Sequence, residues 1–233
     1  AVFAFLRAMR QNLRPQWRAK LVVVGEGGVG KTSLLRRLCG QEYNAHEQTT
    51  RGMEKRVLKL GHPTRPGVQM ELNIWDFAGQ SLYHSLHQFF LTDRSLFLLV
   101  WNARLGYEQC KLDYWLETIR ARAPESPVLI VATHIDQRAA EYPLGELRHR
   151  HPEVRIAGSC ATSNWTMAGL AEVRGHLAEA AAGLPQMGQV WPGPWLEAER
   201  ALGARPEIHL GRAEVRQVLA GHGVVDRAEV LLE

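Results

Sequence analysis

The stretch that most constrains this chain is GEGGVGKT at residues 25–32, which directly follows the apolar run AKLVVVG at 19–25. The apolar run predicts a buried strand, and KTSLLRRL at 31–38 predicts a helix. A strand, a loop of the form G-x-x-x-x-G-K-[ST] and a helix, in this order, are typical of a phosphate-binding loop. The sequence therefore predicts an α/β fold with a nucleotide phosphate site at the end of a buried strand.

The residue types inside this loop suit a phosphate ligand. Its glycines let the chain wrap tightly enough for backbone N–H groups to point inward at phosphate oxygens. The helix N-terminus behind the loop adds a favourable dipole. We expect Lys31 to reach the β- and γ-phosphates and the Thr32 hydroxyl to bind Mg²⁺. The residues expected to contact a nucleotide here are Gly25, Glu26, Gly27, Gly28, Val29, Gly30, Lys31, Thr32 and Ser33.

A second motif, WDFAGQ at residues 75–80, ends the strand-like segment VQMELNIWD. A carboxylate at this point can hold Mg²⁺ directly or through water, so Asp76 is a predicted metal ligand and nucleotide contact. Gly79 can offer its backbone N–H to the γ-phosphate. Gln80 is placed to orient an attacking water and, together with Lys31, is a predicted catalytic residue.

A polar loop, HEQTTRGMEK at residues 46–55, lies between these two motifs and can close over the γ-phosphate. We predict that the Thr50 hydroxyl is a further Mg²⁺ ligand, because Gly52 and the strand that follows give it the usual spacing. Thr49 is the neighbouring residue and stays open as the alternative. The predicted metal ligands are therefore Thr32, Thr50 and Asp76.

The segment ATHID at residues 132–136 follows the apolar run SPVLIV and carries the features of a base-reading loop. A carboxylate at Asp136 can accept hydrogen bonds from the N1–H and the N2 amino group of guanine. Adenine lacks both donors, so a buried carboxylate would reject it. We expect Thr133 to contact the base at N7 in part and to tie neighbouring loops together, and His134 to stack on the base. The segment therefore predicts that guanine is the base bound.

A second base-contacting loop is expected after the next strand, within GSCATSN at residues 158–164. We predict that this loop is formed by Ser159, Cys160 and Ala161. The backbone N–H of Ala161 would then donate to the guanine O6.

The order of segments predicts the rest of the architecture. Strand-like and helix-like segments alternate between residues 16 and 182, which is typical of an α/β fold with helices on both faces of a mostly parallel sheet. A Pro/Gly-rich link at 184–194 separates this region from short helical patterns. The predicted strands are at 19–25, 55–60, 68–76, 95–101, 127–133 and 154–159, and the predicted helices at 1–13, 31–38, 111–122, 144–151, 167–185 and 194–205.

Composition argues against several classes of protein. No apolar run reaches the ~18–20 residues that span a bilayer, so we expect no transmembrane segment. The net charge of +4 comes from basic residues spread along the chain, which does not favour a nucleic-acid partner. The three cysteines lack the spacing of a zinc site or a disulfide framework, so we expect reduced thiols in a cytoplasmic protein. Because the chain begins with Ala and ends inside a helical pattern, we expect a piece of a longer protein.

The motifs GEGGVGKTSLL, WDFAGQ, HQFFL and THID, with the trailing LP…W, resemble the Roco family. In that family a Ras-like domain called Roc (Ras of complex proteins) is followed by a COR domain, and THxD in place of Asn-Lys-x-Asp is a known variation. The resemblance implies a connector helix at 1–15 leading from leucine-rich repeats, and a Roc domain with a six-stranded sheet at 16–183. It implies a linker and the helical, winged-helix-like start of COR at 184–233.

The resemblance also implies a function. It implies GTP hydrolysis with GTP/GDP and Mg²⁺ as ligands, weak nucleotide affinity, and a homodimer formed through COR in the full-length protein. Our first hypothesis is therefore a Mg²⁺-dependent GTPase that acts as a molecular switch in signal transduction. The alternatives are a nucleotide-binding scaffold with negligible hydrolysis and a P-loop ATPase of another lineage. Arg51, Arg94 and Arg104 are candidates for an arginine that stabilises the transition state.

Overall fold

The computed structural model of the 233-residue chain describes residues 12–44, 53–77, 93–141, 144–205 and 210–224. The chain divides into two compact units. One is continuous, Trp17–Met187, and the other combines the two flanking segments, residues 1–16 and 188–233. The segments on either side of the larger unit therefore belong together, which the sequence did not predict.

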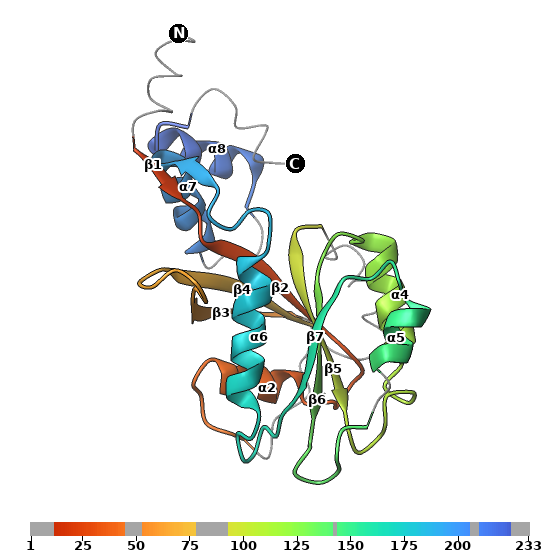
Figure 1. The fold of residues 1–233 in the computed structure, drawn as a ribbon. Helices are drawn as coiled ribbons and strands as arrows, with labels where there is room; N and C mark the ends of the chain where they lie inside the picture. The colour runs from red at the N-terminus through yellow and green to blue at the C-terminus, as the bar shows by residue number, and fades with distance from the viewer. Residues whose placement is uncertain (1–11, 45–52, 78–92, 142–143, 206–209, 225–233) are drawn as a thin grey trace. The chain divides into compact units, whose positions relative to one another are not determined.

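The larger unit is built on a six-stranded sheet with the order β3-β4-β2-β5-β6-β7 (Figure 1). The hairpin of β3 and β4 is antiparallel, and the other neighbouring pairs are parallel. This confirms the predicted α/β fold with a mostly parallel six-stranded sheet. The strands are β2 (Arg18–Val24), β3 (Met53–Gly61), β4 (Gln69–Phe77), β5 (Ser95–Asn102), β6 (Val128–Thr133) and β7 (Ile156–Ala161).

The central strands are almost continuously apolar because both of their faces are covered. All eight residues of β5 and all six residues of β6 are buried. Trp101 on β5 and Trp115 on helix α4 (Leu112–Arg122) are among the largest fully buried side chains. Trp75 on β4 is partly buried and packs against the same core. The main core therefore lies between the sheet and its helices.

Helices cover both faces of this sheet (Figure 1). Helices α2 (Lys31–Leu38) and α6 (Leu170–Ala182) lie on one face and contact each other. Helix α4 lies on the other face with α5 (Leu144–Arg150). The leucines of α2 recur at helical spacing and are buried, which is why this short segment is helical. These four helices agree with the predicted ones.

The smaller unit contains a two-stranded sheet that the sequence analysis missed. Strand β1 (Leu13–Pro15) pairs antiparallel with β8 (Val190–Pro192). Gln16 extends the pairing, because its N–H donates to the Gln189 carbonyl and its carbonyl accepts from the Gly188 N–H, each at 2.8 Å. Strands of three residues show too little hydrophobic alternation to be read from sequence.

The helices of the smaller unit confirm the predicted small helical element. Helix α7 (Gly193–Gly203) and helix α8 (Arg212–Gly221) pack together around a small apolar core. The helix predicted at 1–13 lies mostly outside the described residues, and its last residue, Leu13, begins strand β1. The buried residues of the small core are Ala198, Leu219 and Val224.

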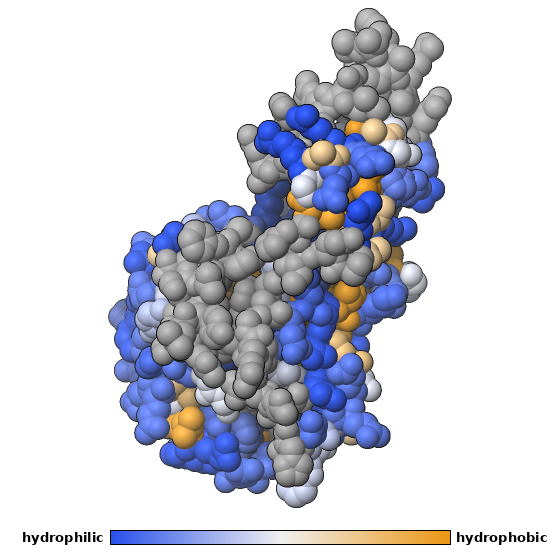
Figure 2. Space-filling view, turned by 180° about the vertical axis from the view of Figure 1, so that it is seen from behind, coloured by the Kyte–Doolittle hydropathy of each residue, from blue (hydrophilic) through white to orange (hydrophobic). Residues whose placement is uncertain are grey.

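Figure 2 shows a mostly hydrophilic surface on one side of the molecule, with apolar residues in small groups. Among the helices formed by the described residues, none is long and apolar enough to cross a membrane.

Gly169 should not tolerate a side chain. It is the N-cap of α6 with φ of 75°, and a Cβ there would overlap the carbonyl oxygen of Ala161. We expect Gly169→Ala to lower the free energy of unfolding by more than the roughly 1–2 kcal/mol that the left-handed conformation alone costs. Gly40→Ala is the matched control, because Gly40 has φ of 77° with open space around its Cβ position. Urea denaturation measures both losses, and equal losses would show that the overlap relaxes without cost.

Candidate functional site

The loops that carry the predicted functional residues gather at one edge of the sheet. Strands β2, β4, β5, β6 and β7 run parallel, so their carboxyl ends all lie at this edge. The phosphate loop follows β2, Asp76 lies near the end of β4, and Thr133 ends β6. In open parallel sheets this is the edge at which ligands bind.

The phosphate loop, residues 25–30, passes closely over strand β5. Gly25 has φ of 137°, and a Cβ there would overlap the carbonyl oxygen of Val100. Gly28 and Gly30 also have positive φ, of 73° and 88°. Because Gly30 is the N-cap of α2, the helix begins directly behind the loop and its free N–H groups favour an anion there.

Lys31, the first residue of α2, places its ammonium inside the loop. The side chain is buried, and Nζ donates to the carbonyl oxygens of Gly25 at 2.9 Å and Glu26 at 2.8 Å. Burial lowers the pKa of Lys31 to about 8, although the negative charge of Asp76 acts in the opposite direction. At pH 7 the group is therefore a charged but desolvated cation, which an anionic ligand would stabilise.

Asp76 and Thr32 meet beside the loop. Thr32 Oγ1 donates to Asp76 Oδ2 at 2.8 Å, whereas Asp76 Oδ1 is buried and has no hydrogen-bond partner among the described residues. Burial raises the pKa of Asp76 to about 6, against the Thr32 hydrogen bond and the charge of Lys31. A carboxylate oxygen with unused lone pairs next to a hydroxyl is a donor pair that suits Mg²⁺. The structure thus brings these two predicted metal ligands together.

Thr133 ties the phosphate loop to the sheet. Its buried hydroxyl lies 2.7 Å from the carbonyl oxygen of Val29 and 3.0 Å from that of Trp101, and its one proton can serve either. The Nδ1 atom of His134 lies 2.8 Å from the same hydroxyl. While the hydroxyl donates to a carbonyl, the ring must donate to the hydroxyl through Nδ1. The predicted role of Thr133 in joining two loops is consistent with these contacts.

His134 and Asp136 present different chemistry at the rim of the site. Burial lowers the pKa of His134, and the charge of Arg104 acts in the same direction, so the ring is neutral at pH 7. Asp136 is exposed, and its hydrogen bond from the Ser163 hydroxyl holds the pKa of this carboxyl below its ordinary value. Asp136 therefore offers an ionised, acceptor-only group to a ligand.

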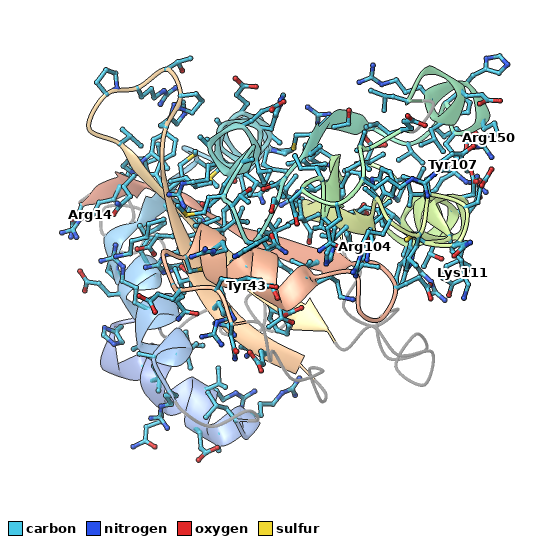
Figure 3. All side chains as sticks on the ribbon, turned by 90° about the horizontal axis from the view of Figure 1, so that it is seen from below. Arg14, Tyr43, Arg104, Tyr107, Lys111 and Arg150 are labelled. Carbon is cyan, nitrogen blue, oxygen red and sulfur yellow. The ribbon has the colours of Figure 1, made fainter. Side chains whose placement is uncertain are left out.

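A pocket of about 360 Å³ opens between these loops. Its walls come from the start of α2, from the segments after β6 and β7, and from Tyr43, which Figure 3 shows beside α2. The predicted base-contacting residues His134 and Asp136 are among those that line it. The full lining is Gly30, Ser33, Tyr43, His134, Asp136, Gln137, Asn164 and Trp165.

The second predicted base loop does not reach this pocket. Ser159, Cys160 and Ala161 lie inside strand β7, which runs further than the sequence indicated. The wall of the pocket is formed instead by the segment after the strand, through Asn164 and Trp165. The small residues of IAGSCA have no period that marks where the strand ends. The signal that could have located the loop was the run TSN at 162–164, the first polar residues beyond the strand.

The remaining predicted residues are two arginines that the structure places and five residues outside its described part. Arg94 directly precedes β5, which puts it at the opposite edge of the sheet from the phosphate loop. Arg104, labelled in Figure 3, donates through Nη1 to Gln137 Oε1 at 3.1 Å, on the side of the pocket. The predicted residues outside the described part of the chain are Thr49, Thr50, Arg51, Gly79 and Gln80.

Comparisons with known proteins agree with the observed fold. A family model described as "Ras of Complex, Roc, domain of DAPkinase" matches residues 20–136, from β2 to Asp136. Among solved structures, the chain is similar to Methanosarcina barkeri Roco2 RocCORdC bound to GDP. That likeness has a TM-score of 0.81 and 27% sequence identity, and it covers 98% of this chain and 69% of that chain.

The relatives with similar sequences are much longer proteins. The probable serine/threonine-protein kinase pats1 of Dictyostelium discoideum is 31% identical over an alignment of 153 residues, which covers 58% of this chain and 5% of that protein. Leucine-rich repeat serine/threonine-protein kinase 1 of Mus musculus is 34% identical over an alignment of 146 residues, which covers 61% of this chain and 7% of that protein. The chain therefore spans only a small part of the length of these relatives.

Replacing the buried carboxylate of Asp76 by a neutral amide should stabilise the metal-free protein. Folding raises the pKa of Asp76 from 3.8 to about 6, so ionisation in the folded state costs about 3 kcal/mol at pH 8. The cost falls as the pH drops through 6 and vanishes below about pH 3, where the carboxyl is protonated in both folded and unfolded states. We expect Asp76→Asn to gain about 1–3 kcal/mol at pH 8 and about half as much at pH 5, measured by urea denaturation in EDTA. A loss of stability at pH 8 would contradict this account.

Removing the hydroxyl of Thr133 should destabilise the phosphate loop. Thr133→Val keeps the shape of the side chain but leaves the buried carbonyl oxygen of Val29 without its donor. We expect the free energy of unfolding to fall by about 1–3 kcal/mol. Thr118→Val is the control, because the Thr118 hydroxyl donates to Tyr114 on an exposed part of α4, and it should cost no more than about 0.5 kcal/mol. Equal costs would contradict a specific role of Thr133.

Proposed function

The chain belongs to the Roc (Ras of complex) domain family, and from this premise we propose that it binds GTP and GDP and hydrolyses GTP as a switch within a larger protein. One observation carries the proposal. The ionised carboxylate of Asp136 lies at the rim of a pocket that begins at the phosphate loop, where Lys31, Thr32 and Asp76 gather. A guanine nucleotide needs this combination of an anion site and a neighbouring acceptor.

We propose that guanine enters the pocket with its N1–H and N2 amino group directed at Asp136. The hydrogen bond from Ser163 orients this carboxylate and keeps it ionised. The rings of Tyr43, His134 and Trp165 line the same pocket and offer stacking surfaces. An adenine base would cover the carboxylate of Asp136 and remove its water without donating to it, because adenine has an acceptor at N1, so ATP should bind much more weakly.

Hydrolysis requires stabilisation of the negative charge that develops on the phosphoryl oxygens. In the proposed mechanism Lys31 exchanges its hydrogen bonds with the carbonyls of Gly25 and Glu26 for bonds with the β- and γ-phosphates. The backbone N–H groups of the phosphate loop and the α2 N-terminus add donors that are already oriented. Gln80 would orient the attacking water in line with the γ-phosphate, and Gly79 would contribute its N–H.

A Mg²⁺ ion fits the donor pair of Thr32 and Asp76. The buried Oδ1 atom of Asp76 has unused lone pairs, and the Thr32 hydroxyl can turn from Asp76 to a metal. Thr50 is the proposed further ligand. When bound, the ion would neutralise charge on the β- and γ-phosphates.

The switch itself would involve the two segments around the γ-phosphate. We propose that the segments at 45–52 and 77–92, which lie almost entirely outside the described part of the chain, contact the γ-phosphate of GTP and lose this contact after hydrolysis. Dimer formation through COR in the full-length protein remains a prediction.

The proposal is tested by multiple-turnover phosphate release from GTP and from ATP with Mg²⁺, using the wild type and Gln80→Ala. We expect turnover of GTP and little of ATP, and a loss of about tenfold or more in Gln80→Ala because the attacking water is no longer oriented. Asp136→Asn serves as the matched variant for base specificity. It should prefer xanthosine triphosphate, whose C2 carbonyl accepts a hydrogen bond from the new amide.

The outcomes separate the alternatives. Binding of GTP without turnover in the wild type would favour the scaffold with negligible hydrolysis. Turnover of ATP as fast as GTP would contradict the role of Asp136 and favour an ATPase.

A further inference from the structure

Arg37 lies in the last turn of α2, the helix whose first residue is Lys31. Its guanidinium contacts two different segments. Nε donates to the carbonyl oxygen of Asn164 at 2.8 Å, and Nη2 donates to that of Trp165 at 3.1 Å. The carbon at the centre of the guanidinium lies 5.8 Å from the centroid of the Tyr43 ring, the geometry of a cation–π contact.

Three of these contacts are with walls of the nucleotide pocket, and a fourth, from Nη1 to the carbonyl oxygen of Gln41 at 3.5 Å, lies two residues before Tyr43. Asn164 and Trp165 form its wall after β7, and Tyr43 forms its wall beyond α2. Arg37 itself is not among the residues that line the pocket. One side chain outside the pocket therefore holds two of its walls, which are more than a hundred residues apart in sequence.

The loop after β7 has a second attachment to the same helix. Asn164 Nδ2 donates to the carbonyl oxygen of Gly30, the N-cap of α2, at 3.1 Å. The loop is thus tied to both ends of α2, at Gly30 and at Arg37. Because the helix is rigid over two turns, these two attachments set how far the base-contacting loop lies from the phosphate loop.

We propose that Arg37 is a positioning residue that slows nucleotide release by holding Trp165 and Tyr43 against the bound base. This inference rests on the proposed guanine-nucleotide binding and assigns a determinant of its lifetime. The planar fork of arginine suits the task, because two of its N–H groups reach two successive carbonyls while its face stacks on an aromatic ring. A lysine ammonium can supply the charge but not this geometry.

The test measures dissociation of mant-GDP from the wild type, Arg37→Ala, Arg37→Lys and Arg174→Ala, with excess GDP as competitor. Arg174 is the matched control: it also donates to two backbone carbonyls, those of Leu38 and Lys59, but neither belongs to the pocket. We expect dissociation about tenfold faster in Arg37→Ala and at least about threefold faster in Arg37→Lys. Arg174→Ala should stay within about twofold of the wild type, because it touches no wall of the pocket.

Hydrogen exchange separates positioning from general support of the helix. In Arg37→Ala, amides of residues 162–168 should exchange faster, whereas those of 34–38 in α2 should keep their protection. A merely structural role would raise exchange in both segments. That result would overturn the proposal, even if dissociation accelerates.

The other possible dissociation rates also decide whether Arg37 has the proposed role. A dissociation rate of Arg37→Ala within twofold of the wild-type rate would overturn the role of Arg37. The role would also be overturned if Arg37→Lys released mant-GDP at the wild-type rate, or if Arg174→Ala accelerated release as much as Arg37→Ala does. If the wild type binds no mant-GDP at all, the proposed function fails and this inference fails with it. Failure of Arg37→Ala alone leaves the proposed function intact.

Discussion

The ligand-binding edge depends on how closely the phosphate loop approaches the sheet. At Gly25 the backbone passes so near the carbonyl of Val100 that no side chain fits. A few residues later the carbonyl of Val29 lies within hydrogen-bond distance of the Thr133 hydroxyl. The loop is therefore shaped by β5 and β6 rather than by its own sequence alone. Lys31 and Thr32 receive their positions from this arrangement, because α2 can begin only where the loop ends.

The two buried charges at this edge of the sheet lack most of the hydration that they would have in water. The ammonium of Lys31 and the carboxylate of Asp76 are both desolvated, and burial shifts the pKa of each towards its neutral form. Folding alone would favour removing them. A phosphate anion and a divalent cation would place opposite charges beside these two groups, so part of the binding free energy would come from offsetting their desolvation. The buried charges that lower the stability of the folded chain are thus the same groups that would bind the phosphate and the cation.

The local parts of this molecule were readable from sequence, and the long-range parts were not. The glycine loop, the start of α2 at Lys31 and the apolar strands follow from motif and pattern, so the sheet could be predicted. The end of β7 could not, because Ser159, Cys160 and Ala161 carry no periodicity, and the predicted base loop was placed inside a strand. The role of Arg37 depends on the backbone carbonyls of Asn164 and Trp165, which are distant in sequence. Every residue has a backbone carbonyl, so the sequence does not indicate which of them accepts a hydrogen bond.

The pairing of β1 with β8 has a mechanical consequence. The chain enters the larger unit next to the point where it leaves, and Gln16 bonds both Gly188 and Gln189 there. Tension applied through the flanking residues would be carried first by this short antiparallel ladder. Because the two strands would be pulled apart from the same end, their hydrogen bonds would open one after another at low force. The sheet between Trp17 and Met187 would bear no load until the β1–β8 ladder had opened.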